Sequence, residues 1–258
     1  MKLELNQSLI KWTKEYFKDN LNGKAVIGIS GGKDSTVCAA ILKEAIGADR
    51  IIAVMMPNGH QTDIRDSYAV CDFLGIPEKN RYNINIFGSY TELMKSVQDN
   101  YLETDRGISD PIKNTLITTN LPARLRMCTL YSIAACYPNS RVVNTSNLSE
   151  RHIGYSTKYG DGAGDFSILG NVLMSEVLMV GDDLGLPYYL VHKIPSDGMS
   201  GQSDEEKIGI PYSEIDKSIQ DDEYVSEYTE KIHRLNIINA HKTNPMPMWR
   251  RDLNKESF

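Results

Sequence analysis

Two serines, two glycines and an aspartate follow directly after a short apolar run near the start of the chain. The stretch reads VIGISGGKDSTVC, and its central residues are Ser30, Gly31, Gly32, Lys33, Asp34 and Ser35. Neighbouring glycines let the backbone turn tightly, and a helix that starts here offers unpaired N–H groups and its positive dipole end to an anion. The carboxylate of Asp34 would repel a phosphate unless a divalent cation lay between them. The pattern therefore predicts a loop that binds phosphate through a bridging Mg²⁺.

This loop differs from the two best-known nucleotide-binding patterns. A Walker loop needs G-x-x-x-x-G-K-[ST], but the spacing from Gly28 to Lys33 is one residue short, and Asp34 replaces the Mg²⁺-binding hydroxyl. The dinucleotide pattern G-x-G-x-x-G is absent. A glycine-rich turn with Asp34 as a helix cap would explain the turn, but not the serines, glycines and aspartate together. The sequence favours an intact phosphate loop that serves a different reaction.

Apolar runs and amphipathic stretches alternate along the chain. The apolar runs predict five strands, at residues 24–30, 51–56, 82–87, 141–147 and 188–194. Helical spacing predicts helices near residues 5–16, 36–46, 63–74, 89–97 and 122–137. Such alternation gives right-handed crossovers and a parallel sheet that is covered on both faces. We therefore expect a single α/β domain over residues 1–258, with a central five-stranded parallel sheet flanked by helices.

The ends of the predicted strands indicate where a ligand binds. In open parallel sheets ligands lie beyond the carboxyl ends of the strands. The loops that begin at Ser30, Pro57 and Thr145 each follow a predicted strand, so they should converge on one site. The segments 105–116 and 195–209 have no periodicity and are predicted to be loops.

Composition excludes several classes of protein. A formal net charge of −6 over 258 residues argues against non-specific nucleic-acid binding, which relies on a basic surface. The N-terminus lacks the apolar region of a signal peptide, and no apolar run reaches the roughly 18 residues of a membrane span. Four cysteines show no zinc-binding spacing, which predicts buried free thiols in a reducing compartment. We expect a cytoplasmic protein that binds neither membrane nor nucleic acid.

The S-G-G-x-D-S loop after the first predicted strand resembles the signature of the N-type ATP pyrophosphatases, which cleave ATP to AMP and pyrophosphate. Further segments resemble the ammonia-dependent NAD synthetases within that group, in the same order along nearly the whole chain. The most specific is GYSTKYGDGAGDF at 154–166. The others are MMPNGHQTDIRDSYAVCDFLG (55–75), NLPARLRMCTLYSIA (120–134), VVNTSNLSE (142–150) and HKTNPMP (241–247).

The resemblance implies a fold of the adenine nucleotide alpha hydrolase type, which is Rossmann-like, and a ligase that forms an amide bond. Such enzymes convert deamido-NAD (nicotinic acid adenine dinucleotide) to NAD in the last step of NAD biosynthesis. ATP adenylates the nicotinate carboxylate, ammonia displaces AMP, and pyrophosphate leaves. No glutamine-hydrolysing domain accompanies the resemblance, so free ammonia, or ammonia from a partner, is the expected nitrogen source. Members of the family are homodimers, which implies the same for this chain.

The resemblance also assigns roles to single residues. It implies that Asp34 and Glu150 bind Mg²⁺ and that Asp34, Lys158 and Asp165 are catalytic. The implied ATP contacts are Gly28, Ile29, Ser30, Gly31, Gly32, Lys33, Asp34, Ser35, Thr145 and Ser196. The implied deamido-NAD contacts are Arg124, Lys158, Asp165, His241 and Lys242. For Asp165, orientation of the nicotinate ring and deprotonation of ammonia both remain open.

Three positions depart from the usual pattern of the family. Met174 stands where many members carry a lysine that contacts ATP, and Lys33 or Lys193 would have to supply that charge instead. Asn144 precedes Thr145 where glycine is more usual. Ser196 replaces a threonine and keeps the hydroxyl. It lies in the polar segment 195–209, for which the resemblance implies a loop that closes over ATP; the alternative is a plain linker.

Two other functions are compatible with the same loop. Another N-type ATP pyrophosphatase, such as a tRNA thiolation enzyme or a GMP synthetase core, would share it. Thiolation would require a persulfide-forming cysteine pair and a basic RNA surface, and the sequence shows neither. A non-catalytic adenine-nucleotide-binding module is the second alternative, and the replacement of lysine by Met174 is the feature that favours it.

Overall fold

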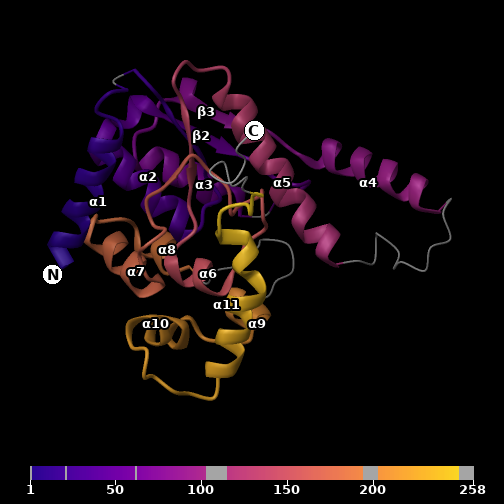
Figure 1. Ribbon diagram of the computed structural model, residues 1–258. Coiled ribbons are helices and arrows are strands. Elements are labelled where there is room, and N and C mark those ends of the chain that lie inside the picture. The colour runs from indigo at the N-terminus through magenta and orange to yellow at the C-terminus, as the bar shows by residue number, and fades with distance from the viewer. Residues whose placement is uncertain (1, 21, 62, 103–114, 194–202, 250–258) are drawn as a thin grey trace, which may run out of the picture.

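A central parallel sheet organises the computed structural model, which describes residues 2–20, 22–61, 63–102, 115–193 and 203–249 (Figure 1). The strands are β1 (Ala25–Gly28), β2 (Ile51–Met55), β3 (Arg81–Asn83), β4 (Arg141–Asn144) and β5 (Phe166–Ser167). They lie in the order β3-β2-β1-β4-β5, and every neighbouring pair is parallel. The α/β class and the five-stranded parallel sheet are confirmed.

The central strands form where the sequence has its apolar runs. Every residue of β2 is buried, as expected for a strand that is covered on both faces. β1 pairs with β2 on one side and with β4 on the other, which places the strand before the glycine-rich loop in the middle of the sheet. Strands near 24–30, 51–56, 82–87 and 141–147 are therefore confirmed, with shorter bounds than predicted.

The predicted fifth strand at 188–194 is wrong. Residues Tyr188–Val191 form a short helix, α8, which begins directly after Pro187. Tyr188 and Tyr189 are exposed whereas Leu190 and Val191 are fully buried, and this pairing does not fit the alternation of a strand. The fifth strand is Phe166–Ser167, which pairs with Val143 and Asn144 of β4. Two residues are too short to produce a recognisable apolar run.

Helices cover the sheet and continue beyond it. Before and between the first four strands lie α1 (Lys2–Tyr16), α2 (Lys33–Ile46), α3 (Ile64–Phe73), α4 (Phe87–Leu102) and α5 (Thr115–Ala134). After β4 follow α6 (Leu148–Ile153), α7 (Met174–Asp183), α8, α9 (Asp204–Ile208), α10 (Tyr212–Gln220) and α11 (Thr229–Thr243). Single 3-10 turns occur at Ala48–Arg50 and Glu78–Asn80.

The two faces of the sheet have separate cores. On one face α2 and α7 pack against β1 and β2 through residues such as Val37, Ile41 and Val177. On the other face α5 supplies Met127 and Leu130 to a smaller cluster. Burial of both faces fixes the sheet as a rigid platform from which the strand-end loops project.

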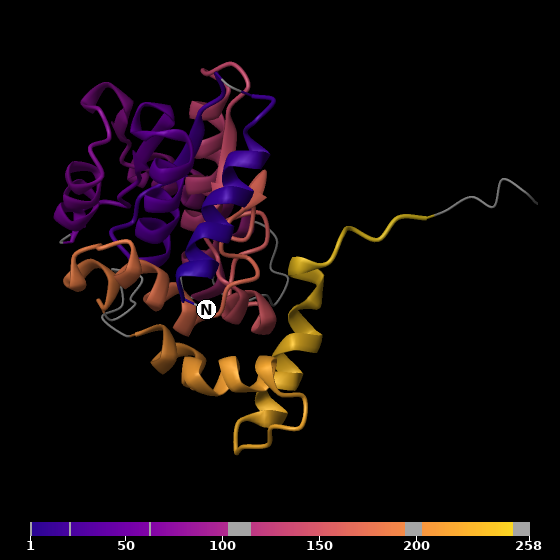
Figure 2. The same cartoon turned by 90° about the vertical axis from the view of Figure 1, so that its left-hand side faces the viewer.

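A third apolar cluster joins the C-terminal helices to the sheet domain. It contains Ile153 of α6, Met174 of α7, Ile215 of α10 and Ile232 of α11. Figure 2 shows these orange and yellow helices as a layer below the sheet and its flanking helices. Asp216 of α10 strengthens the joint, because its buried carboxylate accepts hydrogen bonds from the Ser149 hydroxyl and the Ser175 backbone N–H.

Several loop and thiol predictions can be compared with this fold. The predicted loop 105–116 lies mostly outside the described residues, and its last two residues already belong to α5. Of the predicted loop 195–209, residues 203–209 are described, and they form α9 with a capping box at Ser203, so that part of the prediction is wrong. All four cysteines are free, but Cys128 and Cys136 are exposed on or just after α5, where burial was expected. Among the described residues no helix is long and apolar enough to cross a membrane.

Candidate functional site

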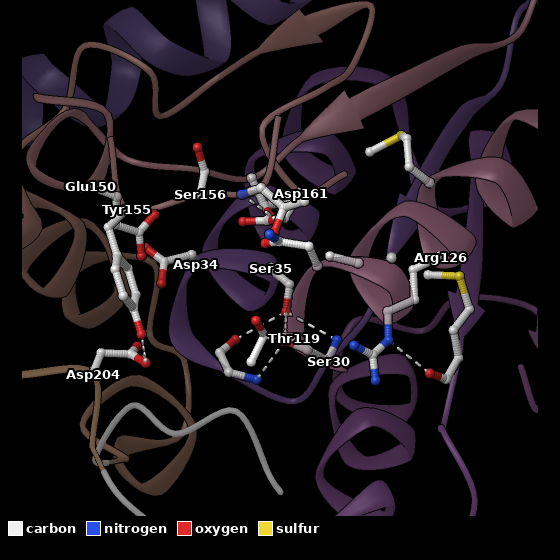
Figure 3. A pocket seen from close by; sticks show the side chains of 18 of the residues that line it. Ser30, Asp34, Ser35, Thr119, Arg126, Glu150, Tyr155, Ser156, Asp161 and Asp204 are labelled. Atoms are coloured by element: carbon white, nitrogen blue, oxygen red, sulfur yellow. Dashed lines mark hydrogen bonds between the residues drawn. The ribbon is translucent and has the colours of Figure 1, made fainter. Parts of the chain in front are cut away.

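A cavity of about 960 Å³ lies at the carboxyl ends of the central strands (Figure 3). Ser30, Asn58 and Thr145 line it from the loops after β1, β2 and β4, which confirms that these three loops converge. α5 closes one wall, and α9 and α11 contribute the wall opposite the phosphate loop. The cavity therefore lies between the sheet domain and the C-terminal helices.

The glycine-rich loop takes a shape that only glycine permits at one point. Gly31 has a φ of +79°, and a Cβ there would lie 2.8 Å from the Asp66 Cβ in α3. Within the loop the Ser35 hydroxyl donates to the Gly32 carbonyl, and the Gly32 N–H donates to the Ser30 hydroxyl. α2 begins at Lys33 with no side-chain cap, so its first N–H groups face the anion position expected for this loop.

One buried amide links Asp34 and Glu150, two of the acidic residues that line the cavity. Asn147 Nδ2 donates to Asp34 Oδ1 at 3.0 Å, and Asn147 Oδ1 accepts from the Glu150 N–H at 3.0 Å. The Asn147 N–H donates in turn to Glu150 Oε2 at 3.2 Å, which completes a capping box at the start of α6. Asn147 is fully buried, so Asp34 and Glu150 are held in place by an amide that solvent does not reach.

The two carboxylates face one another across a small gap (Figure 3). Burial raises the pKa of Glu150 well above its usual range, and the negative charge of Asp34 raises it further. The ammonium group of Lys33 lies 3.0 Å from Asp34 Oδ2 and offsets part of this charge. The arrangement concentrates negative charge beside an anion-binding loop, which fits a position for a cation.

Most of the ATP contacts implied by the sequence line this cavity. They are Gly28, Ile29, Ser30, Gly32, Lys33, Asp34, Ser35 and Thr145, and the implied metal ligand Glu150 lies with them. Gly31 belongs to the same loop but packs against α3. Ser196 lies outside the described residues.

The residues expected to bind deamido-NAD divide into three groups. Lys242 of α11 lines the cavity and donates to the Gly154 carbonyl at 2.8 Å. Arg124, Lys158 and His241 lie side by side next to lining residues, because Arg124 Nε donates to the Lys158 carbonyl and Lys158 Nζ donates to the His241 carbonyl. Asp165 lies apart from both.

The Asp165 carboxylate is engaged with β4 and α5. Its Oδ2 accepts the Val142 N–H at 2.7 Å, and its Oδ1 accepts the Tyr131 hydroxyl at 3.2 Å. Burial raises the pKa of Tyr131 to about 12, and the Asp165 charge adds to the effect. Asp165 does not line the cavity. Its carboxylate contacts β4 and α5, away from the phosphate loop.

Met174, which replaces the usual lysine, belongs to the apolar cluster of the C-terminal helices. It is buried among Ile153, Tyr212 and Ile215, and it does not line the cavity. The two lysines expected to supply the missing charge both line the cavity. Lys33 is paired with Asp34, and Lys193 lies 2.8 Å from Asp63 and 2.6 Å from Asp66.

Other lining residues were not predicted from the sequence. Asp161, which lies inside the quoted YGDG stretch, accepts the Thr157 N–H, and burial raises its pKa. Tyr155 donates its hydroxyl to Asp204 Oδ1 at 3.0 Å across the cavity wall. Arg126 and the α9 and α11 residues Lys207 and Lys231 complete the charged lining. Asp161, Tyr155 and Arg126 stand in quoted segments without an assigned role. Asp204, Lys207 and Lys231 are single residues that the fold brings together.

A parallel sheet with a glycine-rich loop between its central strand and a helix defines a nucleotide-binding α/β protein. The family model described as NAD synthase matches residues 5–251, so the chain belongs to the NAD synthase family. The "NH(3)-dependent NAD(+) synthetase" of Alkaliphilus metalliredigens is 33% identical over 243 residues, which are 94% of this chain and 96% of the relative. The protein of that name from Pyrococcus furiosus is 38% identical over 79% of this chain and 73% of its own.

Solved structures agree on the fold. A structure titled "NMN synthetase" from Francisella tularensis superimposes with a TM-score of 0.84 at 31% identity, covering 97% of this chain and 99% of its own. An "NH3-dependent NAD synthetase" from Campylobacter jejuni superimposes with a TM-score of 0.72 at 24% identity, covering 97% of this chain and 100% of its own.

The position of Met174 generates a prediction. We expect Met174→Lys to lower the free energy of unfolding by at least about 2 kcal/mol, because an ammonium group would be buried without a partner. We expect no gain in ATP affinity, since the side chain does not reach the cavity. Urea denaturation and ATP titration measure the two effects.

Ser175→Lys is the matched control, because Ser175 is the exposed neighbour of Met174 on α7 and should tolerate the charge. Tighter ATP binding by Met174→Lys at unchanged stability would show that position 174 faces the nucleotide.

Proposed function

We propose that this protein is an ammonia-dependent NAD synthetase, which uses ATP to amidate deamido-NAD to NAD and releases AMP and pyrophosphate. The observation that carries the proposal is the lining of the cavity. There the phosphate loop, two facing carboxylates and the cations of α9 and α11 meet in a chain that is similar to "NH(3)-dependent NAD(+) synthetases" over nearly its full length. The family match favours this reaction over thiolation or GMP synthesis.

The chemistry explains why such a cavity is needed. A nicotinate carboxylate is a poor electrophile, so ATP must first convert it to an adenylate. The N–H groups at the start of α2 are placed to bind the departing pyrophosphate. Lys207, Lys231 and Lys242 line the opposite wall, where they offset the charge of two anionic nucleotides held close together. Ammonia then displaces AMP and forms the amide.

The residues present fit a Mg²⁺ ion that is shared with the nucleotide. Asp34 and Glu150 offer two carboxylates, and the described residues contain no cluster of three or more acidic, histidine or cysteine ligands. Mg²⁺ keeps several waters and commonly takes one or two carboxylates plus substrate phosphates, so two are sufficient. Bound there, Mg²⁺ would neutralise charge on the phosphates. Asn147 would hold both ligands in place.

A second candidate substrate is nicotinic acid mononucleotide, which amidation would convert to NMN. The favouring observation is the structure titled "NMN synthetase", which superimposes with a TM-score of 0.84, against 0.72 and 0.73 for two structures titled as NAD synthetases. The same carboxylate would be amidated, and the substrate would lack the adenylyl half. Curated relatives at 33–38% identity carry the NAD synthetase name, so deamido-NAD remains the first candidate.

We expect the wild-type protein to form amide and AMP in equal amounts from ATP, Mg²⁺, ammonium and the acid nucleotide. Chromatography measures both products. Deamido-NAD and nicotinic acid mononucleotide are offered separately, and the ratio of their kcat/KM values identifies the substrate. A ratio of at least tenfold toward the mononucleotide would overturn the first candidate. AMP without amide would mean that another acid is activated, and no AMP with either acid would favour the non-catalytic binding module.

The proposed metal role predicts the effect of removing one charge. We expect Asp34→Asn to lower kcat/KM at least 100-fold, because charge neutralisation by a metal contributes several kcal/mol to the transition state. The amide oxygen of the new side chain keeps the hydrogen bond from Asn147, and loss of the repulsion with Glu150 should leave thermal stability equal or higher. Steady-state kinetics and a thermal melt are the measurements.

Asp222→Asn, at an exposed position, is the matched control and should behave as wild type. An active Asp34→Asn enzyme would remove Asp34 from the metal site.

The expected homodimer has a candidate interface. Trp12 and Tyr16 of α1 stack on one another, Tyr16 stacks on Phe166, and Tyr131 of α5 lies close to Tyr16. Trp12, Tyr16 and Tyr131 are each at least 37% exposed, so they form an aromatic surface that a second copy could cover. All four cysteines are free, which fits the cytoplasmic location that we propose.

We expect the wild-type protein to sediment as a dimer and Trp12→Glu to shift it toward the monomer. Tyr188→Glu is the control, because it places the same charge on an exposed aromatic residue of α8. Sedimentation velocity at equal concentrations makes the comparison. Monomeric wild-type protein, or two variants that behave alike, would contradict this interface.

A further inference from the structure

Asn144, the last residue of β4, is buried at 5% exposure and uses all of its hydrogen-bonding capacity. Its Nδ2 donates to the carbonyls of Asp161 and Ala163, at 2.8 and 3.0 Å. Its Oδ1 accepts from the Ser146 N–H at 3.2 Å and from the Ser167 hydroxyl at 3.0 Å. A glycine, the more usual residue at this position, could make none of these contacts.

The two donated bonds fix the loop 156–163 against the sheet. This loop places Thr157 and Asp161 in the wall of the cavity, and it carries Lys158 toward α11. The chain then passes very close to β4, since a Cβ on Gly164 would lie 2.7 Å from the Asn144 Cβ. Asn144 therefore holds the second half of the loop, residues 161–163, against the end of β4.

The accepted bond from Ser146 shapes a second segment. It forms a side-chain turn at the end of β4, which directs Thr145 into the cavity and leads to Asn147, the residue that links Asp34 and Glu150. One side chain thus connects the loop 156–163 with the strand end that carries the phosphate-side residues. The first half of the loop has other bonds. The Thr157 hydroxyl donates to Asn120 Oδ1, and Lys158 is bonded to Arg124 and His241. In the second half, Asn144 binds the carbonyls of Asp161 and Ala163, and the Ser146 hydroxyl adds a longer bond to the Asp161 carbonyl at 3.4 Å. Asn147 has its own bonds to Asp34 and Glu150.

We propose that Asn144 is a positioning residue that holds the loop 156–163 in place for the acid nucleotide, and that it affects ATP binding much less. The inference rests on the proposed function for its kinetic consequence only. Asp161 is the lining group that would move most if the two donated bonds were lost, because Lys158 is also bonded to α5 and α11. Asn144 itself touches neither substrate nor metal, because it does not line the cavity.

Two variants separate the contributions of Asn144. Asn144→Gly removes all four bonds, and Asn144→Asp keeps the acceptor for Ser146 but places a carboxylate against two carbonyl oxygens. We expect both to raise the KM for the acid nucleotide about tenfold, as two lost hydrogen bonds would. The KM for ATP should stay within twofold in Asn144→Asp. Ser167→Ala is the matched control, because it removes one bond to Asn144 without touching the loop.

Hydrogen exchange provides a readout that needs no turnover. Backbone N–H groups at 160, 162 and 163 are bonded within the loop, so their exchange reports on its order. We expect faster exchange over 157–163 in both Asn144 variants and wild-type exchange in Ser167→Ala. If the wild-type protein formed no amide, the proposed function would fail while exchange still tested the role of Asn144. Unchanged exchange in the Asn144 variants, or equal rises of both KM values in Asn144→Asp, would overturn the inference.

Discussion

The site depends on holding two carboxylates close together beside a phosphate loop. Asp34 comes from the start of α2 and Glu150 from the first turn of α6, and both residues are bonded to the buried side chain of Asn147. Burial raises the pKa of Glu150 and repulsion by Asp34 raises it further, which is a cost in free energy that the fold must offset. The capping box, the ammonium group of Lys33 and the packing of α6 supply that compensation. A cation shared with a nucleotide would relieve the repulsion between the two carboxylates. The same closeness of Asp34 and Glu150 therefore destabilises the free protein and favours metal binding.

The rest of the fold serves to keep α6 in place. Its Ser149 is bonded to Asp216 of α10, and the same carboxylate accepts the Ser175 N–H at the start of α7. The C-terminal helices are therefore anchored directly beside Glu150, through a polar contact inside an apolar cluster. Because α9 and α11 belong to this layer, any change in how α10 packs alters the distance between the phosphate loop and the lysines on the opposite wall. The C-terminal helices therefore form part of the wall of the cavity.

The sequence predicts those parts of the structure that arise from strong local patterns. The first four strands and the helices around them have apolar runs or helical spacing, and the phosphate loop has a dense combination of residue types. β5 could not be found, because it has two residues and exists through its pairing with β4. Lys207, Lys231 and Asp204 could not be found either, since their place in the cavity follows from the docking of α9 and α11. Asn144 is visible in the sequence as a departure, but its partners are not, because the carbonyls of Asp161 and Ala163 reach it only through the fold of the loop.

Two of the three departures from the family pattern, Met174 and Asn144, lie in the described residues and have the same physical character. Met174 replaces a charge with an apolar side chain, and the surrounding cluster of Ile153, Tyr212 and Ile215 is packed around it. Asn144 replaces glycine with an amide, and four partners satisfy it. In each case the neighbourhood is adapted to the new residue, whereas the phosphate loop, Asp34 and Glu150 are retained. A binding module for a metal–nucleotide complex would keep the same carboxylates, so the preference for an enzyme comes from the relatives that the chain matches, which are named as synthetases.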